Sequence, residues 1–198
     1  MSKLALITGG TSGIGLSIAK KFAGLGINIA LNGKTDNPTN FIQSLKSDYK
    51  VDFFYHNANM LNFSEIEDFY SKTKEKYGKS PDILVNNAGI QYVSPVENFP
   101  NEKFEEIIKV NLISVFYLTK LIIPDMKVKK FGRIVNIASA HGLVASPFKS
   151  AYVAAKHGVV GFGKSVALET AQDVVYLKIV CNYYLLLFLL CCVNLYLV

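Results

Sequence analysis

The chain has 198 residues, of which 51% are hydrophobic and 18% charged, and its formal net charge is +6. This composition excludes an intrinsically disordered chain, and the length suits one domain with a substantial core. The lysines are scattered along the chain rather than gathered in one stretch, so we expect no nucleic-acid partner.

Apolar runs alternate with helical periodicity from the N-terminus onward. The predicted strands cover residues 3–8, 27–31, 51–55, 82–85 and 133–138. The predicted helices cover residues 14–25, 38–47, 64–77 and 102–123, the last ending before Pro124, and one more helix carries Tyr152 and Lys156. This alternation predicts an α/β fold, a Rossmann-type doubly wound parallel sheet with three αβα layers. Ligands of such sheets gather at the carboxyl ends of the strands.

The first predicted strand leads into a glycine-rich turn, T-G-G-T-S-G-I-G, at residues 8–15. Glycines at 9, 13 and 15 let the backbone turn tightly and approach a pyrophosphate at the N-terminal end of the next helix. The order of strand, turn and helix predicts a dinucleotide site. A structural turn without a ligand remains the alternative.

The end of the second predicted strand normally discriminates between NAD and NADP. An acidic residue there would bind the ribose 2′-hydroxyl, and a basic residue would accommodate a 2′-phosphate. This chain has Asn32, Gly33 and Lys34, with Asp36 slightly later. The local sequence therefore leaves the choice of cofactor open.

Two further polar features lie in apolar surroundings. The fourth strand is followed by N-N-A-G, residues 86–89, whose small residues would let a cofactor ring lie close to the backbone, although an ordinary turn explains them equally well. Asn111 lies within V-N-L-I of the long predicted helix. A buried asparagine has a purely structural alternative, in which it bridges backbone groups.

Tyr152 and Lys156 are four residues apart and therefore share one face of a helix. An ammonium group one turn away favours the phenolate, so Tyr152 could exchange a proton with an alcohol or ketone. Ser139 ends the strand before this helix and could hydrogen-bond the same substrate oxygen. The three residues together predict a proton-transfer site, whereas the spacing alone is a weak signal.

These motifs together resemble the classical short-chain dehydrogenases/reductases over about residues 3–170. The resemblance implies a catalytic tetrad of Asn111, Ser139, Tyr152 and Lys156. In it Tyr152 is the general acid-base, Lys156 supports the phenolate and binds the nicotinamide ribose, Ser139 orients the substrate oxygen, and Asn111 holds a relay water. The resemblance also implies that the cofactor contacts Tyr152, Lys156, Gly9, Thr11, Ser12, Gly13, Ile14, Gly15, Asn59, Asn87, Ala88 and Gly89.

Within this family the chain is most similar to a bacterial subgroup, the D-3-hydroxybutyrate dehydrogenases. The likeness lies in N-N-A-G-I-Q at 86–91, A-S-A-H-G-L-V-A-S at 138–146 and K-S-A-Y-V-A-A-K-H-G-V-V-G-F at 149–162. It implies a homotetrameric NAD enzyme that interconverts D-3-hydroxybutyrate and acetoacetate. Gln91, His141 and Lys149 would hold the substrate carboxylate beside Ser139 and Tyr152, although each of the three also has a structural or solvated alternative.

The resemblance also leaves two other functions open. One is an NADPH-dependent reductase of 3-oxoacyl thioesters, and the other is an inactive remnant that retains nucleotide binding only. A thioester has no free carboxylate for Gln91, His141 and Lys149 to hold, which argues against the reductase. Asn59 and Met60 stand where the family usually has an acidic residue beside the adenine, so we expect weakened adenine binding.

The C-terminal part departs from the family pattern after about residue 171. We expect an incomplete dehydrogenase domain at 1–171 and an aberrant hydrophobic tail at 172–198, with the last strand and the substrate lid missing. Residues 179–198 carry no charge, and either they form a candidate membrane-spanning helix or the reading frame is lost near Gln172. We expect the chain as it stands to have negligible activity and to be membrane-associated or aggregated.

The cysteines and the N-terminus bear on the compartment. The three cysteines, Cys181, Cys191 and Cys192, offer neither a disulfide framework nor the spacing of a zinc site. We expect no hydrophobic signal segment before the first strand. The main body is therefore predicted to be cytoplasmic, with no metal, and membrane contact is expected only through the tail.

Overall fold

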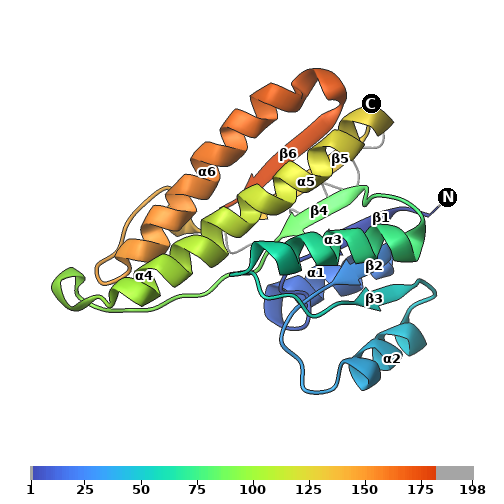
Figure 1. Cartoon of the computed structure of the whole chain (residues 1–198), viewed down its shortest axis with the longest axis horizontal. Helices are drawn as coiled ribbons and strands as arrows, with labels where there is room; N and C mark the ends of the chain where they lie inside the picture. Colours follow the sequence, from blue (N-terminus) through green and yellow to red (C-terminus); the bar gives the residue numbers. More distant parts are fainter. Residues whose placement is uncertain (1, 182–198) are drawn as a thin grey trace.

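The computed structural model describes residues 2–181, and in this part six parallel strands form one sheet of order β3-β2-β1-β4-β5-β6 (Figure 1). The strands are β1 (Leu4–Ile7), β2 (Asn28–Leu31), β3 (Phe53–Tyr55), β4 (Ile83–Asn86), β5 (Gly132–Ile137) and β6 (Val175–Val180). The α-helices are α1 (Gly13–Ala23), α2 (Pro38–Asp48), α3 (Phe63–Tyr77), α4 (Asn101–Ile108), α5 (Ser114–Lys129) and α6 (Ser150–Thr170). Short turns of 3-10 helix are η1 (Val96–Asn98), η3 (Ala140–Gly142) and η4 (Ala171–Asp173). The predicted Rossmann-type fold is confirmed.

The strand order reverses between β1 and β4. Ile7 of β1 pairs with Leu31 of β2 on one side and with Val85 of β4 on the other. The chain therefore leaves β1 toward one half of the sheet and leaves β4 toward the other half. A crevice forms at such a reversal, outside the carboxyl ends of the strands, and it is the usual ligand site of this architecture.

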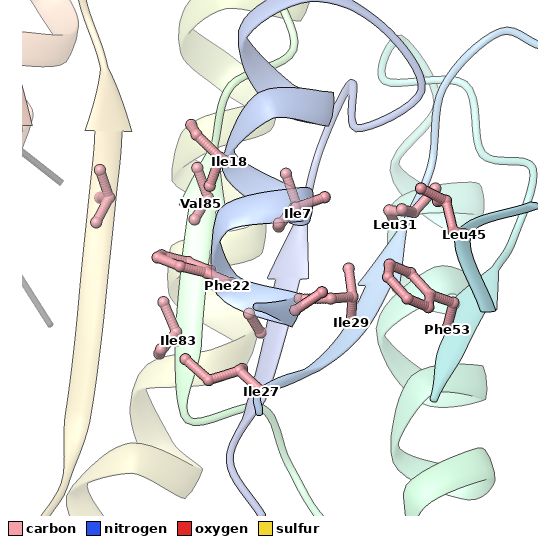
Figure 2. Packing of buried hydrophobic residues seen from close by; sticks show 14 of the residues in the cluster. Ile7, Ile18, Phe22, Ile27, Ile29, Leu31, Leu45, Phe53, Ile83 and Val85 are labelled. Atoms are coloured by element: carbon pink, nitrogen blue, oxygen red, sulfur yellow. The ribbon is translucent and has the colours of Figure 1, made fainter. Parts of the chain in front are cut away.

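Successive side chains of each strand point to opposite faces of the sheet and enter different cores. On one face, Ile18 and Phe22 of α1 pack against Ile7, Ile29 and Val85, as Figure 2 shows. On the other face α3 and α5 cover a second cluster. Its fully buried members include Leu4, Leu6, Ile66, Phe69, Leu84 and Ile122. The two cores hold the strands in one register. The carboxyl ends of the strands, where the site lies, therefore have fixed relative positions.

The long helix predicted over residues 102–123 is interrupted and extended in the structure. A π-helical turn, η2 (Lys109–Ile113), separates α4 from α5, and α5 continues past Pro124 to Lys129. The prediction that Pro124 ends the helix is therefore wrong. A proline removes one backbone hydrogen bond, and here the buried contacts of Ile122 and Met126 keep the helix intact on both sides of it.

Among the described residues, the run Asn101–Lys129 is long and apolar enough to cross a membrane by length and composition. Leu118, Ile122 and Met126 of this run are buried against the sheet and α3. Such burial is typical of the core helix of a globular domain. The predicted membrane-spanning segment, residues 179–198, lies outside the described residues except for its first three positions.

Part of the segment assigned to the aberrant tail belongs to the sheet. Residues 175–180 form β6, which pairs in parallel with β5 from Gly132↔Val175 to Ile137↔Val180. Strand formation follows from the β-branched and aromatic residues of V-Y-L-K-I-V, of which Val175 and Val180 are buried. The sheet therefore continues beyond residue 172, contrary to the expectation that no strand follows residue 171. Residues 182–198, the rest of the expected tail, lie outside the described part.

Candidate functional site

The glycine-rich turn connects β1 to α1 at the reversal of strand order. Gly9 and Gly13 have positive φ angles of 62° and 51°, a conformation that favours glycine. A side chain at Gly15 would collide with the Gly9 carbonyl and with the Asn87 amide. The turn therefore brings its backbone to the N-terminal end of α1, where free N–H groups and the helix dipole suit a phosphate.

The N-N-A-G loop after β4 is fastened to this turn. The Oγ1 atom of Thr8 accepts hydrogen bonds from the backbone N–H groups of Asn87 and Ala88, each at 2.9 Å. The Asn87 amide donates to the Thr8 and Gly9 carbonyls at 2.9 and 3.0 Å. Asn87 thus uses its amide hydrogens to shape the glycine turn, and it does not line the groove described next.

A groove of about 600 Å³ lies along the carboxyl ends of β1, β2, β3 and β4. Its walls contain six of the predicted cofactor residues, namely Gly9, Thr11, Ser12, Asn59, Ala88 and Gly89. Gly13, Ile14 and Gly15 lie outside its lining, at the start of α1. Asn32, Gly33, Lys34 and Met60, which the sequence placed near the ribose and the adenine, also line it. The sequence prediction missed Asn57, Ala58, Leu61, Ile90, Glu106 and Val110. Asn57, Ala58 and Leu61 follow β3 at the same edge of the sheet, and this position is the signal that could have found them.

Asn111 lies in the π-helical turn and is buried. Its Oδ1 accepts from the Ile90 N–H at 2.8 Å, and its Nδ2 donates to the Ile90 carbonyl at 2.8 Å. The side chain therefore bridges backbone groups of the loop after β4, which is the structural alternative considered for it. A π-helical turn displaces the local hydrogen-bond pattern and is frequent at functional sites.

Tyr152 and Lys156 share one face of α6, as their spacing predicts. The Lys156 Nζ lies 5.6 Å from the centre of the Tyr152 ring and donates to the Ile137 carbonyl at the end of β5, at 2.7 Å. Only 4% of Lys156 is exposed. Burial away from water lowers the pKa of its ammonium group to about 8. Lys156 is thus held rigidly beneath Tyr152, and it loses its proton more readily than an exposed lysine does.

Ser139 and His141 complete the same corner of the sheet edge. Ser139 lies two residues after the end of β5, and its hydroxyl accepts the His141 N–H at 3.2 Å. The His141 ring lies 3.4 Å from Ser139 Oγ through Nδ1 and 2.9 Å from Ser146 Oγ through Nε2. The same ring meets Tyr152 edge to face, with the ring centres 5.9 Å apart. Ser139, His141 and Tyr152 therefore lie together beside Lys156.

Gln91 and Lys149 lie on two loops that flank this corner. Gln91 is exposed and Lys149 is half-buried at the start of α6. The loops are joined by a backbone hydrogen bond from the Ser94 N–H to the Phe148 carbonyl, at 2.9 Å. The side chains of Gln91 and Lys149 thus come from segments that approach each other near Tyr152.

The family follows from similarity to known proteins. The short chain dehydrogenase profile matches residues 3–186, which extends past β6. The chain belongs to the short-chain dehydrogenase family. Dehydrogenases of this family bind a nicotinamide cofactor, and the groove, the Gly15 contact and the start of α1 fit a dinucleotide.

Relatives within the short-chain dehydrogenase family differ in their sequence identity to this chain. The chain is 51% identical to the D-beta-hydroxybutyrate dehydrogenase of Cupriavidus necator over 179 residues, which cover 90% of this chain and 69% of the relative. It is 50% identical to the enzyme of that name from Rhizobium meliloti, with 94% and 72% covered. A 3-oxoacyl-[acyl-carrier-protein] reductase of Haemophilus influenzae is 36% identical, with 85% and 68% covered.

Solved structures agree on the fold. An alcohol dehydrogenase from Thermococcus sibiricus, complexed with 5-hydroxy-NADP, superposes with a TM-score of 0.85 at 28% identity and covers 91% of this chain and 76% of its own. A short-chain dehydrogenase from Streptomyces avermitilis gives a TM-score of 0.84 at 25% identity, with 91% and 65% covered. The described residues thus have the arrangement of this family.

Proposed function

We propose that this short-chain dehydrogenase interconverts D-3-hydroxybutyrate and acetoacetate with NAD. The observation that carries the proposal is the meeting of Ser139, His141 and Tyr152 above the buried Lys156, at the edge of the sheet that also forms the groove. The identities of 50–51% to two D-beta-hydroxybutyrate dehydrogenases support the substrate, because the reductase of thioesters is more distant at 36%.

In the proposed reaction NAD, held by the groove and the start of α1, would supply the acceptor for the hydride of C3 of the hydroxy acid. Tyr152 takes the proton of the C3 hydroxyl group in the oxidation and returns it in the reduction. The charged form of Lys156 stabilises the phenolate of Tyr152 and binds the nicotinamide ribose. Ser139 donates a hydrogen bond to the substrate oxygen. Asn111, whose side chain bonds both backbone groups of Ile90, would hold a relay water at the π-helical turn.

The remaining cofactor contacts follow from the groove. Gly9, Thr11, Ser12, Gly13, Ile14 and Gly15 would surround the pyrophosphate at the start of α1. Ala88 and Gly89 would lie against the cofactor. Asn87, which precedes them, would support the site because its amide donates to the Thr8 and Gly9 carbonyls of the glycine turn. Asn59 would lie beside the adenine, because it lines the groove next to Leu61. Its backbone N–H donates to the Glu65 carboxylate, and its Oδ1 accepts the Leu61 N–H.

The substrate carboxylate would be held by Gln91, His141 and Lys149. A lysine with two uncharged donors supplies charge and direction without a competing base. The hydrogen bond between Ser94 and Phe148 supports this set because it joins the loops of Gln91 and Lys149. A 3-oxoacyl thioester offers no carboxylate, so the reductase is the less favoured alternative. The other alternative, an inactive remnant, would bind the nucleotide in the groove without catalysing a reaction.

We also propose that the protein is cytoplasmic and assembles as a homotetramer. Phe104, Phe116 and Leu168 are exposed large apolar side chains on α4, α5 and α6, the helices through which the tetramer is expected to assemble. A contact with a second copy would cover them.

Replacing Lys149 tests the carboxylate set. A suitable parent is a restored form, in which residues 1–181 continue into the C-terminal segment of the Cupriavidus necator relative, because the match covers 69% of that enzyme. Lys149→Ala should raise the KM for hydroxybutyrate roughly tenfold to a hundredfold, the cost of one charge-assisted hydrogen bond, and leave the Kd of NAD within about twofold. Initial rates and cofactor titrations measure both.

The methyl ester of hydroxybutyrate is the control substrate. Because it lacks the charge, the ester should react equally well with the parent and with Lys149→Ala. Lys164→Ala, at an exposed position on α6, serves as the control variant. Equal losses of affinity for hydroxybutyrate and NAD would show that Lys149 has a structural role instead.

A further inference from the structure

The loop between η3 and α6 is held in place at both ends. At its start, a Cβ atom at Gly142 would lie 2.9 Å from the Lys156 carbonyl, so the loop leaves η3 packed closely against α6. At its end, Phe148 has a φ of 66°, which is unusual for a bulky residue, and its carbonyl accepts the Ser94 N–H at 2.9 Å. Ser146, two residues before Phe148, therefore has a defined position beside the catalytic corner.

Ser146 is the one polar residue of this loop, whose sequence between Gly142 and Lys149 is L-V-A-S-P-F. Its side chain is half-buried, and its Oγ lies 2.9 Å from the Nε2 atom of His141. The large apolar side chains of the loop are exposed, namely Leu143, Val144 and Phe148. The loop thus turns its single hydroxyl group toward the catalytic corner.

The two ring nitrogens of His141 face two different hydroxyl groups. Nδ1 lies 3.4 Å from Ser139 Oγ, and Nε2 lies 2.9 Å from Ser146 Oγ. The Tyr152 ring meets the imidazole edge to face, so it takes neither nitrogen. Because an imidazole makes hydrogen bonds only through its two nitrogens, a ligand that bonds to His141 must approach one of these two serines.

The two directions lead to different parts of the proposed substrate. Ser139, on the Nδ1 side, is the residue that donates to the C3 oxygen in the proposed reaction. A carboxylate that His141 holds must therefore meet Nε2, where Ser146 Oγ lies. A carboxylate only accepts hydrogen bonds, so Nε2 must carry the hydrogen of the neutral ring and Nδ1 must be bare.

We propose that Ser146 is a further residue of the site for the substrate carboxylate. In the free protein its oxygen accepts the Nε2–H of His141 and so occupies the place of a carboxylate oxygen. In the complex the Nε2–H and the Ser146 hydroxyl both donate to the carboxylate, beside the charge of Lys149. The proposal rests on the proposed function, because it concerns the same substrate.

Replacing Ser146 in the restored form tests the contact with the carboxylate. Ser146→Ala should raise the KM for hydroxybutyrate about tenfold, because one hydrogen bond to a charged group is lost. The kcat and the Kd of NAD should stay within about twofold, since this bond is equally present before and during the reaction. Ser146→Thr keeps the hydroxyl group and should restore the KM. The methyl ester of hydroxybutyrate should distinguish Ser146→Ala from the parent far less than the acid does.

The control variant is Ser44→Ala, which removes an exposed hydroxyl group on α2 and should match the parent. Ser146→Ala should fold, because the hydrogen bond to His141 is the one that the Ser146 side chain makes among residues 2–181. An unchanged KM in Ser146→Ala would overturn the proposal. So would equal losses in KM, kcat and NAD affinity, or a KM that Ser146→Thr does not restore, because either result assigns Ser146 to the packing of the loop.

The hydrogen on the His141 ring gives a test in the full chain without substrate. Nitrogen NMR distinguishes a protonated from a bare ring nitrogen, and the loss of signals in His141→Gln identifies this ring among the three histidines. We expect the hydrogen on Nε2. A hydrogen on Nδ1 would overturn the proposal, because Nε2 would then have nothing to donate.

The outcomes also separate this proposal from the proposed function. A restored parent that oxidises hydroxybutyrate, with a KM that is the same in Ser146→Ala, overturns only the role of Ser146. A restored parent that does not oxidise hydroxybutyrate overturns the proposed function and the role of Ser146 together.

Discussion

Tyr152→Phe should lower the turnover of hydroxybutyrate by about a thousandfold in the restored form, because the only group that exchanges the substrate proton is lost. The Kd of NAD should stay within about twofold, since the phenylalanine ring keeps the packing of Tyr152 against His141 and the apolar cluster with Ala151 and Ala155. Stopped-flow absorbance at 340 nm and a cofactor titration give the two quantities.

A second tyrosine serves as the matched control. Tyr49 lies at the end of α2, away from the catalytic corner, and Tyr49→Phe removes the same hydroxyl group. Its turnover should equal that of the parent. Turnover of Tyr152→Phe within tenfold of the parent would refute the assignment of Tyr152 as the acid-base.

Lys156→Met should abolish most of the turnover and yet stabilise the fold at neutral pH. Methionine fills a similar volume and removes a charge that burial disfavours, at the cost of about 1 kcal/mol for the hydrogen bond to the Ile137 carbonyl. A residue that contributes to catalysis at the expense of stability is typical of an active site.

The pH dependence of this difference has a definite sign. Lys156 has a pKa of about 8 in the folded chain, lowered from 10.5 by burial, so above pH 8 the folded chain gives up a proton that the unfolded chain keeps up to about pH 10.5. The free energy of unfolding of the parent, relative to Lys156→Met, should therefore rise with pH across this window and stay constant below it. Urea unfolding of both proteins between pH 6 and pH 10.5 measures this relation, and a difference independent of pH would contradict the burial of a titrating ammonium group.

The order of elements could be predicted from sequence because each strand and helix carries its own pattern. Ile7 and Phe22 lie in apolar runs of the expected period, and glycines mark the ends of α1 and α3. The spacing of Tyr152 and Lys156 predicts their shared face without any tertiary information. These features depend on short-range rules, which a single sequence contains.

Other features depend on contacts between distant segments. The π-helical turn at Asn111 leaves no signature in the hydrophobic period, and the partner of Asn111, Ile90, lies 21 positions away. The side chain of Asn32 also joins distant segments, because it accepts the Gly9 N–H and donates to the Ala58 carbonyl. Strand β6 differs from these features, because a local pattern indicates it. The expected end of the domain, at residue 171, lies before this strand. The β-branched residues of V-Y-L-K-I-V at 175–180 are a local signal for a strand, and the expected tail includes them.

The most direct test of the account is the choice of substrate by the restored form. D-3-hydroxybutyrate, its L enantiomer and a 3-oxoacyl thioester are compared at equal concentrations, with the cofactor followed at 340 nm and Lys149→Ala run in parallel. We expect NADH to form with the D enantiomer, at a rate far above that with the L enantiomer, and the thioester to be a poor substrate. Faster reduction of the thioester, or oxidation of hydroxybutyrate that is indifferent to Lys149→Ala, would contradict the account.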